Sequence, residues 1–394
     1  MGKKAQKKIL FITPAAKRDG ANIFLLRFLR WLKAETSIPF CTIYNAGGEL
    51  EKEFRELSDS FQYSLCRQPA NFLERRFHGL LRRLEFKRHW LNFQLKKHNI
   101  GLIYNNTVVN HQIIDAFHDP DVPILTHCHE LESVIHRTGL EEFGETKNKT
   151  AHFIAVSEAT RRNLMTNHEI ASEKISLVRG FVPVETLPAD VLAEKRRKIL
   201  KHLNIPSDAF VVGASGTIQW RKAPDVYVQI ASKIRKSYPE LPIYFLWIGG
   251  TQKNDFVFFE MDYDIRKLGL EKRFRILEHQ SNPSDYYAAL DVFAMVSRED
   301  PFPLVCLEAA AFGTPVVCFE NGGGTPEFVG EDCGFIVPYL DAEVFAAKIV
   351  TLFRRRELAE TFGSNAARKV RERHSLEKSA PQILNLIKEW GNFR

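Results

Sequence analysis

The chain has 394 residues, 44% of them hydrophobic and 26% charged, which is the composition of an ordinary globular protein. This composition excludes a largely disordered chain, and no apolar run reaches the ~20 residues that a membrane-spanning helix needs. The length exceeds what one hydrophobic core usually holds, so we expect two domains. The basic N-terminus runs straight into an apolar segment that resembles a first strand, and a secretory signal is therefore not expected.

The formal net charge of +7 lies entirely in the N-terminal half of the chain. Residues 66–98 hold nine basic and two acidic residues, and bulky apolar residues recur among them at helical spacing. This pattern is typical either of a core-packed helix pair with a solvated basic face or of a surface that binds anionic lipid or an anionic acceptor. No nucleic-acid recognition motif accompanies the basic residues, so we expect no nucleic-acid partner. The six cysteines show no paired spacing, which predicts reduced thiols in a cytoplasmic protein.

Short apolar runs alternate with longer helical stretches along the whole chain. In the first half, the expected strands are 8–13, 39–44, 100–104, 122–126 and 152–156. After a charged helix near 190–202 the alternation restarts, with strands expected at 210–215, 242–248, 273–277, 291–295 and 315–319. Such alternation predicts parallel sheets covered by helices on both faces. We therefore predict an α/β protein with two such domains, at 1–183 and 184–375, followed by a C-terminal helix at 376–394.

One loop in the second half, SREDPFPLVCLEAAAFGTPVV, combines several features of a ligand site. It follows an expected strand, and Pro303 suits the first turn of a helix, where a missing N–H costs nothing. The N–H groups of Leu304 and Val305 would then point toward an anion. Asp300 precedes this helix, and Glu308 lies about one and a half turns into it. These features together predict a site for a diphosphate that joins a sugar to a ribose.

Asp300 and Glu308, followed by AA, GTPVV and GGGTPE, resemble the signature of family 4 glycosyltransferases. The resemblance covers most of the chain and implies the GT-B fold, in which two Rossmann-like doubly wound domains face each other across a cleft. It implies that the domain at 1–183 binds the acceptor, that the domain at 184–375 binds the nucleotide sugar, and that the helix at 376–394 packs back toward the first domain. It implies metal-independent, retaining sugar transfer, with Asp300 on the donor sugar and Glu308 on the ribose. This sequence departs from the family pattern at two positions. The first acidic residue is usually Glu in the family and is Asp300 here, although the neighbouring Glu299 could take its place. Pro303 stands where the family has a glycine. The donor-binding residues implied in this loop are Phe302, Pro303, Leu304, Val305 and Glu308.

A second segment, VVGASGTIQWRKAPD, resembles the strand, glycine loop and basic pair with which the family holds the donor diphosphate. Gly216 would permit close approach of the backbone, and Arg221 and Lys222 would supply positive charge to the leaving group. Thr217 and Ala223 stand where the family often has Arg and Gly. A solvated start of a helix is the alternative interpretation of this segment.

The first half of the chain carries weaker signals. Gly20, in GAN after the first strand, matches the family's glycine-rich loop that meets the diphosphate, although a lone glycine suits any tight turn. In THCHELE, at the end of a strand, His129 matches the family's histidine that faces the reacting sugar better than His127 does. A purely structural role for both histidines stays open.

Asp262 and Asp264 spell a metal-binding DxD, but they fall in an expected helix, so we predict no metal site and no cofactor. The predicted activity is retaining transfer of a sugar from a nucleotide-diphosphate sugar to a glycan or lipid-linked acceptor in cell-surface polysaccharide synthesis. The basic stretch further predicts a cytoplasmic enzyme on the anionic inner face of the membrane. A non-catalytic nucleotide-sugar-binding scaffold and a GT-B epimerase are the alternatives.

Overall fold

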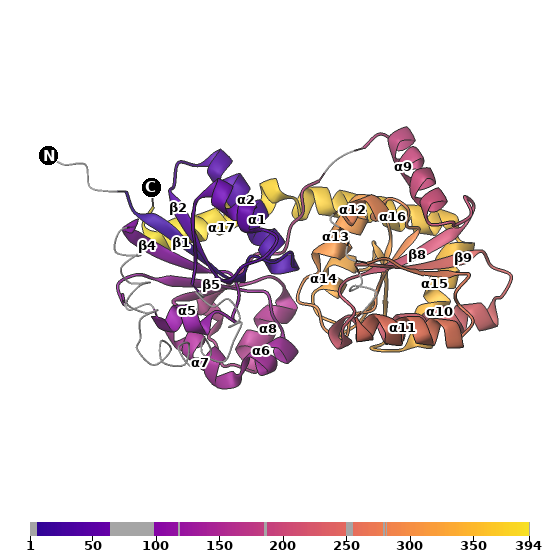
Figure 1. Cartoon of the computed structure of the whole chain (residues 1–394), viewed down its shortest axis with the longest axis horizontal. Coiled ribbons are helices and arrows are strands. Elements are labelled where there is room, and N and C mark those ends of the chain that lie inside the picture. The colour runs from indigo at the N-terminus through magenta and orange to yellow at the C-terminus, as the bar shows by residue number, and fades with distance from the viewer. Residues whose placement is uncertain are drawn as a thin grey trace, which may run out of the picture. The chain divides into compact units, whose positions relative to one another are not determined.

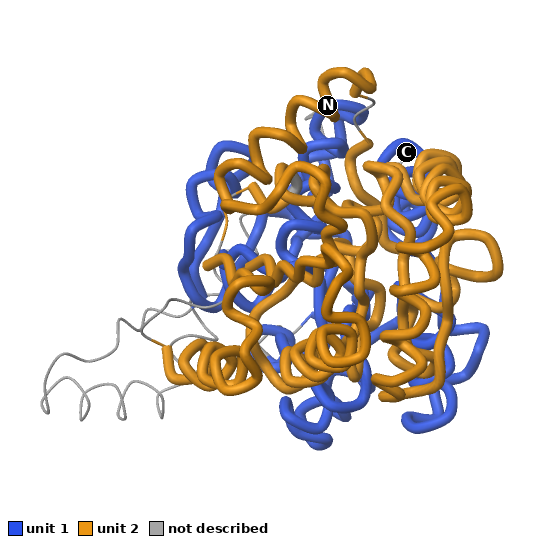
Figure 2. Tube along the Cα trace, turned by 90° about the vertical axis from the view of Figure 1, so that its right-hand side faces the viewer, with its two compact units in different colours: residues 1–179, 376–394 blue, residues 180–375 orange. Residues whose placement is uncertain are grey.

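The structure is a computed structural model in which contacts divide the chain into two compact units (Figures 1 and 2). Unit 1 comprises residues 1–179 and 376–394, and unit 2 comprises residues 180–375. The residues that the structure describes are 6–63, 98–116, 119–184, 187–249, 255–278, 280 and 282–393. The basic stretch at 66–97, on which the predicted membrane surface depends, lies outside the described residues.

Unit 1 is built on a seven-stranded sheet in the order β3-β2-β1-β4-β5-β6-β7, and all of its pairs are parallel. The order reverses between β1 and β4, which is the point where doubly wound sheets bind ligands beyond the carboxyl ends of their strands. The strands are β1 (Lys8–Ala15), β2 (Phe40–Ala46), β3 (Asp59–Gln62), β4 (Ile100–Asn105), β5 (Ile124–Cys128), β6 (His152–Ala155) and β7 (Ile175–Leu177).

The helices of unit 1 follow its strands, as crossover connections between parallel strands require. The first begins where Asp19 caps it, because the Asp19 carboxylate accepts the N–H of Asn22 at 2.9 Å. The last returns to unit 1, where it contacts the first helix and β4, and its Trp390 stacks on His152 at 5.1 Å. The helices are α1 (Gly20–Glu35), α2 (Glu51–Leu57), α5 (His111–Ala116), α6 (Glu132–Thr138), α7 (Leu140–Lys149), α8 (Glu158–Thr166), η1 (Ser172–Lys174) and α17 (Leu376–Gly391).

Unit 2 repeats the same architecture with a six-stranded parallel sheet in the order β10-β9-β8-β11-β12-β13. The strands are β8 (Phe210–Ser215), β9 (Ile243–Ile248), β10 (Phe274–Ile276), β11 (Val292–Met295), β12 (Val316–Phe319) and β13 (Gly334–Val337). The helices are α9 (Ala189–His202), η2 (Trp220–Lys222), α10 (Pro224–Ser237), α11 (Phe256–Lys267), α12 (Ser284–Tyr287), α13 (Leu304–Ala311), α14 (Thr325–Val329), α15 (Ala342–Arg354) and α16 (Arg356–Arg373). The core is mostly aliphatic and includes buried aromatic side chains of β8, α10, β9 and β10.

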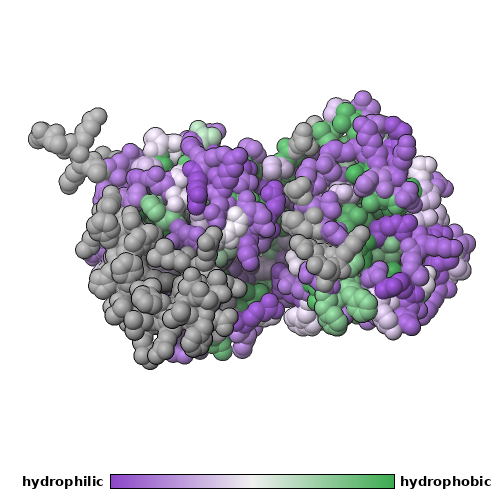
Figure 3. Space-filling model, viewed as in Figure 1, coloured by the Kyte–Doolittle hydropathy of each residue, from purple (hydrophilic) through white to green (hydrophobic). Residues whose placement is uncertain are grey.

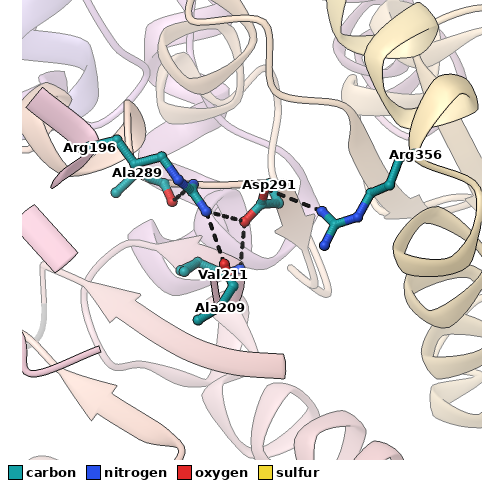
Figure 4. A network of polar contacts seen from close by, with 6 residues as sticks. All are labelled: Arg196, Ala209, Val211, Ala289, Asp291 and Arg356. Carbon is teal, nitrogen blue, oxygen red and sulfur yellow. Dashed lines mark hydrogen bonds and ion pairs between the residues drawn. The ribbon is translucent and has the colours of Figure 1, made fainter. Parts of the chain in front are cut away.

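A polar network holds two helices to the edge of this sheet at which β8 and β11 begin (Figure 4). The Asp291 carboxylate accepts the backbone N–H of Val211 at 2.7 Å and an N–H of Arg196 at 2.9 Å. Arg356 approaches the same carboxylate at 3.5 Å. Because Arg196 lies on α9 and Arg356 opens α16, the network fixes both helices to the amino-terminal edge of the sheet.

The prediction of two Rossmann-like units with parallel sheets is confirmed, and each expected strand is present within two residues at each end. Three strands were not predicted, namely β3, β7 and β13. The surface in Figure 3 is mostly hydrophilic, and the most exposed large apolar side chains among the described residues are Phe256 and Trp220, at 71% and 60%. No described helix is both long and apolar enough to span a bilayer. The described cysteines are free and buried, as expected.

Candidate functional site

The predicted donor-binding residues gather at the carboxyl-terminal edge of the unit 2 sheet. Three neighbouring strands, β8, β11 and β12, end there, and the loops that follow them are 216–223, 296–303 and 320–324. Adjacent parallel strands deliver their loops to one edge, so residues far apart in the sequence meet there. Lys222 and Asp300, which are 78 residues apart, are in direct contact.

Asp300 lies between the two predicted cations. Its carboxylate contacts the Lys222 ammonium through Oδ2, and its Oδ1 lies 3.5 Å from a guanidinium nitrogen of Arg221. The Ser297 hydroxyl donates to Oδ2 at 3.4 Å. The side chains of Asp300, Lys222 and Arg221 are 8%, 12% and 19% exposed, so the three charges are largely withdrawn from water.

The electrostatics of this cluster follow from burial and charge. Burial by itself raises the pKa of Asp300, but the attraction of Lys222 and then of Arg221 outweighs it and holds the pKa below its usual value. Burial lowers the pKa of Lys222, and the attraction of Asp300 opposes this only in part. One carboxylate therefore neutralises two neighbouring cations incompletely, and the cluster favours an added anion.

The loop after β12 fixes the backbone of Asp300. The Asp300 N–H donates to the carbonyl of Gly322 at 2.8 Å, and its own carbonyl accepts the N–H of Gly324 at 3.1 Å. Between them Gly323 has a φ of +119°, and a Cβ at this position would lie 1.8 Å from the Asp300 carbonyl oxygen. Only glycine fits at this position, so the GGGTPE motif has a structural role, which is to hold the backbone of Asp300.

The glycine loop after β8 fits closely around Lys222. Gly216 has a φ of +144°, and a Cβ there would lie 3.2 Å from the Cδ and Cε atoms of Lys222. The indole N–H of the buried Trp247 donates to the Gly216 carbonyl at 2.9 Å and holds this loop from the side of β9. Gly216 therefore leaves room for the stem of Lys222, the residue that lies against the acid. Trp247 was not predicted, because nothing in its local sequence links it to the loop.

The helix after Asp300 begins one residue later than predicted. Pro303 is the N-cap of α13 rather than a residue of its first turn, and it forms no side-chain cap. Leu304 and Val305 are then the first two helical residues, and Glu308 is the fifth and is partly buried. Phe302 is buried and stacks on the His374 ring at 5.3 Å, so its ring packs within unit 2.

In unit 1, His129 follows directly after β5. The Nε2 atom of its ring is enclosed and has no hydrogen-bond partner among the described residues. The backbone N–H of His129 donates to the carboxylate of Glu130 at 2.9 Å. Burial lowers the pKa of His129 to about 3, so the ring is neutral near pH 7. The neighbouring His127 is fully buried, and its Nδ1 lies 2.5 Å from the Tyr104 hydroxyl, so His127 belongs to the core.

Two further sequence predictions can be placed. Gly20 is the exposed first residue of α1, and a Cβ there would meet nothing within 4 Å, so packing does not require glycine. Asp262 of the DxD sequence lies on α11 and pairs with Arg266 at 3.0 Å, one helical turn away. The helical position predicted for this sequence is thus confirmed.

Two family models match the chain: "Glycosyl transferases group 1" over residues 195–369 and "Glycosyltransferase Family 4" over residues 19–186. Among curated proteins, the D-inositol 3-phosphate glycosyltransferase of Saccharomonospora viridis is 28% identical over 284 residues, which are 68% of this chain and 65% of that protein. The enzyme of the same name from Kribbella flavida is 29% identical over 219 residues, 54% of this chain and 50% of that protein. The chain thus spans between half and two thirds of the length of these relatives.

Solved structures share the fold over nearly the whole chain. Anabaena Alr3699/HepE in complex with UDP and glucose has a TM-score of 0.78 at 19% identity, covering 97% of this chain and 100% of that one. A glycosyltransferase from Rickettsia africae has a TM-score of 0.75 at 19% identity, covering 98% and 99%. These neighbours have the GT-B fold. With the two family models between them matching most of the sequence, the chain belongs to the family 4, group 1 glycosyltransferases.

Proposed function

We propose that this protein transfers a sugar from a nucleotide-diphosphate sugar to a hydroxyl of a glycan or lipid-linked acceptor, with retention of the anomeric configuration. The observation that carries the proposal is the largely buried cation pair, Arg221 and Lys222, at the carboxyl-terminal edge of the unit 2 sheet. A diphosphate is the group that two such cations and a helix N-terminus suit best.

In the proposed reaction, the bond between the anomeric carbon and the diphosphate oxygen breaks, and its electron pair leaves with the diphosphate. Arg221, Lys222 and the N–H groups of Leu304 and Val305 stabilise this developing negative charge. The acceptor hydroxyl attacks from the face that the diphosphate leaves, and its proton passes to a phosphate oxygen. The protein supplies no base in this scheme, and the two cations take the place that a metal ion would fill.

The two acidic residues have separate roles in the proposal. Asp300 accepts hydrogen bonds from the hydroxyls of the donor sugar once the diphosphate has taken over the cations. Glu308, on the second turn of α13, accepts hydrogen bonds from both hydroxyls of the ribose. In unit 1, His129 is neutral near pH 7 and is proposed to accept or donate a hydrogen bond at the reacting sugar through its enclosed Nε2. Gly20 is proposed to lie against the diphosphate.

The relatives guide the choice of the first donors. Anabaena Alr3699/HepE has been solved with UDP and with UDP-glucose, so UDP-sugars are tested first. Slow donor hydrolysis is measured across UDP-, GDP- and dTDP-sugars, and NMR identifies the anomer formed with an acceptor. Release of the nucleoside diphosphate with a retained anomer supports the proposal. Binding without turnover across the panel favours the scaffold, and a changed sugar still joined to the nucleotide favours the epimerase.

We further propose that the enzyme is cytoplasmic and docks on an anionic membrane to reach a lipid-linked acceptor of a cell-surface polysaccharide. The support is the basic stretch at 66–98, whose cations each contribute about 1 kcal/mol near an anionic surface. Sedimentation with anionic and zwitterionic liposomes at two salt concentrations tests this. Salt-sensitive binding to anionic liposomes should be lost in Arg75/Arg76/Arg82/Arg83→Glu and kept in a control that reverses four exposed lysines of unit 2, namely Lys201, Lys236, Lys267 and Lys272. Equal pelleting of both variants would favour a water-soluble acceptor.

A further inference from the structure

Arg298 lies two residues before Asp300 and reaches across to the segment that carries the cation pair. One of its terminal nitrogens, Nη1, donates to the Trp220 carbonyl at 2.9 Å. Both terminal nitrogens donate to the Asp225 carboxylate, at 2.9 and 2.7 Å. The guanidinium also lies over the Trp220 ring, 5.4 Å from its centroid, and the side chain is only 14% exposed. Arg298 thus has a defined position and a bidentate partner.

The main chain around Arg298 forms further contacts with the same segment. The Arg298 N–H donates to the Arg221 carbonyl at 2.8 Å, and the Arg221 guanidinium donates back to the Glu299 carbonyl at 2.9 Å. From the loop after β13, the Tyr339 hydroxyl donates to the Arg298 carbonyl at 3.1 Å. The loop after β11 and the start of α10 are therefore joined by backbone and side-chain bonds in both directions.

The partners of Arg298 bracket the two cations. Trp220 and Asp225 lie on either side of Arg221, Lys222 and Ala223 in the sequence. This short segment does not hold its shape by local preference, because Ala223 has a left-handed φ of +54° and α10 begins without a side-chain cap. A left-handed conformation costs a non-glycine residue about 1–2 kcal/mol, so tertiary contacts must maintain it. Those of Arg298 reach both ends of the segment.

We infer that Arg298 is a positioning residue that holds Arg221 and Lys222 in the geometry needed to bind the donor diphosphate. The inference rests on the function proposed above. Three of the five N–H donors of Arg298 already donate to Asp225 and Trp220, so we expect Arg298 to act through the segment and not on the ligand. Lysine cannot reproduce the arrangement, since a single ammonium lacks the planar pair of donors that matches a carboxylate.

The test compares a nucleoside diphosphate with its monophosphate, for example UDP with UMP, by isothermal titration calorimetry on the full chain. Both ligands share the base and ribose, so the ratio of their affinities reports how well the protein binds the second phosphate. In Arg298→Lys and Arg298→Met we expect this ratio to fall about tenfold, which corresponds to about 1.4 kcal/mol. Asp225→Asn breaks the same bidentate pair from its other side and should lower the ratio in the same direction.

The matched control is Arg196→Met. Arg196 also pairs with an aspartate inside unit 2 (Figure 4), but this pair lies at the amino-terminal edge of the sheet, whereas the candidate site lies at the carboxyl-terminal edge. Its loss should lower the melting temperature without changing the ratio of affinities. A second control uses Lys222→Met: if Arg298 acts through the cation pair, adding Arg298→Met to that variant should weaken diphosphate binding by clearly less than the tenfold expected in the wild-type background, because only Arg221 is left to be misplaced.

An unchanged ratio in folded Arg298→Lys and Asp225→Asn overturns the inference, and so does a full additional loss in the Lys222→Met background. The first result would make Arg298 a structural residue only, and the second would mean that Arg298 contributes to diphosphate binding independently of Lys222. If the wild-type protein binds none of UDP, GDP and dTDP, the proposed donor site itself is wrong and the inference falls with it. Wild-type binding with an unchanged ratio leaves the donor site in place and removes the role of Arg298 alone.

Discussion

Replacing Asp300 with asparagine removes the negative charge that lies against the two cations and changes the size of the side chain little. In the wild-type protein this carboxylate contacts Lys222 directly and lies 3.5 Å from Arg221. The substitution therefore leaves two largely buried cations without their counter-charge, which is the costly way to break an ion pair.

The size of the effect can be bounded. Removing one partner of a buried pair usually costs about 3–5 kcal/mol. Arg221 is the more exposed of the two cations and the more distant from the carboxylate, so we expect the lower end, about 3 kcal/mol. For a unit of this size, each kcal/mol lowers the melting temperature by about 2–4 °C, which predicts a decrease of about 6–12 °C.

Binding should respond in the opposite direction. In the wild-type protein a diphosphate competes with Asp300 for both cations, whereas in Asp300→Asn it does not. We therefore expect UDP to bind at least as tightly to the variant, while turnover of the donor falls because the sugar hydroxyls lose a charged acceptor. Saturating UDP, at about 100 times its dissociation constant, should restore about 2.7 kcal/mol of the lost stability. Thermal unfolding with and without UDP, calorimetry and a donor-hydrolysis assay measure the three quantities.

The reasoning fails if Asp300→Asn unfolds at the wild-type temperature, or if its affinity for UDP decreases tenfold. The first result would mean that the pair contributes no net stability, and the second that the carboxylate itself takes part in holding the diphosphate. Asp262→Asn is the matched control, because Asp262 pairs with Arg266 at 3.0 Å on the exposed face of α11. Loss of that exposed pair should cost less than about 1 kcal/mol and leave binding unchanged.

Three further predictions concern single residues. Glu308→Gln should weaken UDP binding about tenfold in calorimetry, because a neutral amide is a poorer acceptor for two ribose hydroxyls; equal affinity would exclude Glu308 from the ribose site. Gly323→Ala would place a Cβ 1.8 Å from the Asp300 carbonyl oxygen, so the melting temperature and UDP binding should fall together, and a variant that keeps both would refute the close packing. Burial makes the pKa of His129 lower in the folded protein, about 3, than in the unfolded protein, about 6.5. Between these two pH values the unfolded chain binds one more proton at this residue than the folded chain does. The free energy of unfolding therefore rises with pH in this range, by at most about 1.4 kcal/mol per pH unit. His129→Asn should reduce this slope in chemical unfolding, and an unchanged slope would contradict the neutral ring.

The strands that position the site were predictable because they are buried on both faces. β8 lies in the largely apolar run FVVGAS, and β12 lies in the largely apolar run PVVCF. Such runs between helical patterns are typical of central parallel strands. The strands that were missed, β3, β7 and β13, have three or four residues each, and all three are edge strands of their sheets. Edge strands need no continuous apolar run, so short mixed sequences such as DSFQ carry little signal.

The candidate site was predictable in its parts but not in its contacts. Asp300 and the basic pair were each found from their motifs, yet no local pattern indicates that the carboxylate contacts both cations across 78 residues. The pair of Arg298 and Asp225, 73 residues apart, is a contact of the same kind. It depends on the order of β8 and β11 in the sheet, and the choice of neighbouring strand is a tertiary property. Motifs therefore located the residues of the candidate site, and the contacts that hold these residues in place required the structure.

The departure from the family at Ala223 can be weighed in free energy. Its left-handed φ of +54° costs alanine about 1–2 kcal/mol relative to glycine. Two effects oppose this cost. Alanine restricts the unfolded chain more than glycine does, which stabilises the folded protein by about 0.4–1 kcal/mol. The fully buried methyl group of Ala223 stabilises it by about 0.8 kcal/mol more. The two sides cancel within their range, and the turn keeps the conformation that glycine would adopt. Ala223 therefore gives no support to a non-catalytic scaffold. That alternative depends instead on the two departures in the loop after β11, namely Asp300 in place of the usual Glu and Pro303 in place of glycine. The missing N–H of Pro303 lies one residue before the helical N–H groups proposed to bind the diphosphate.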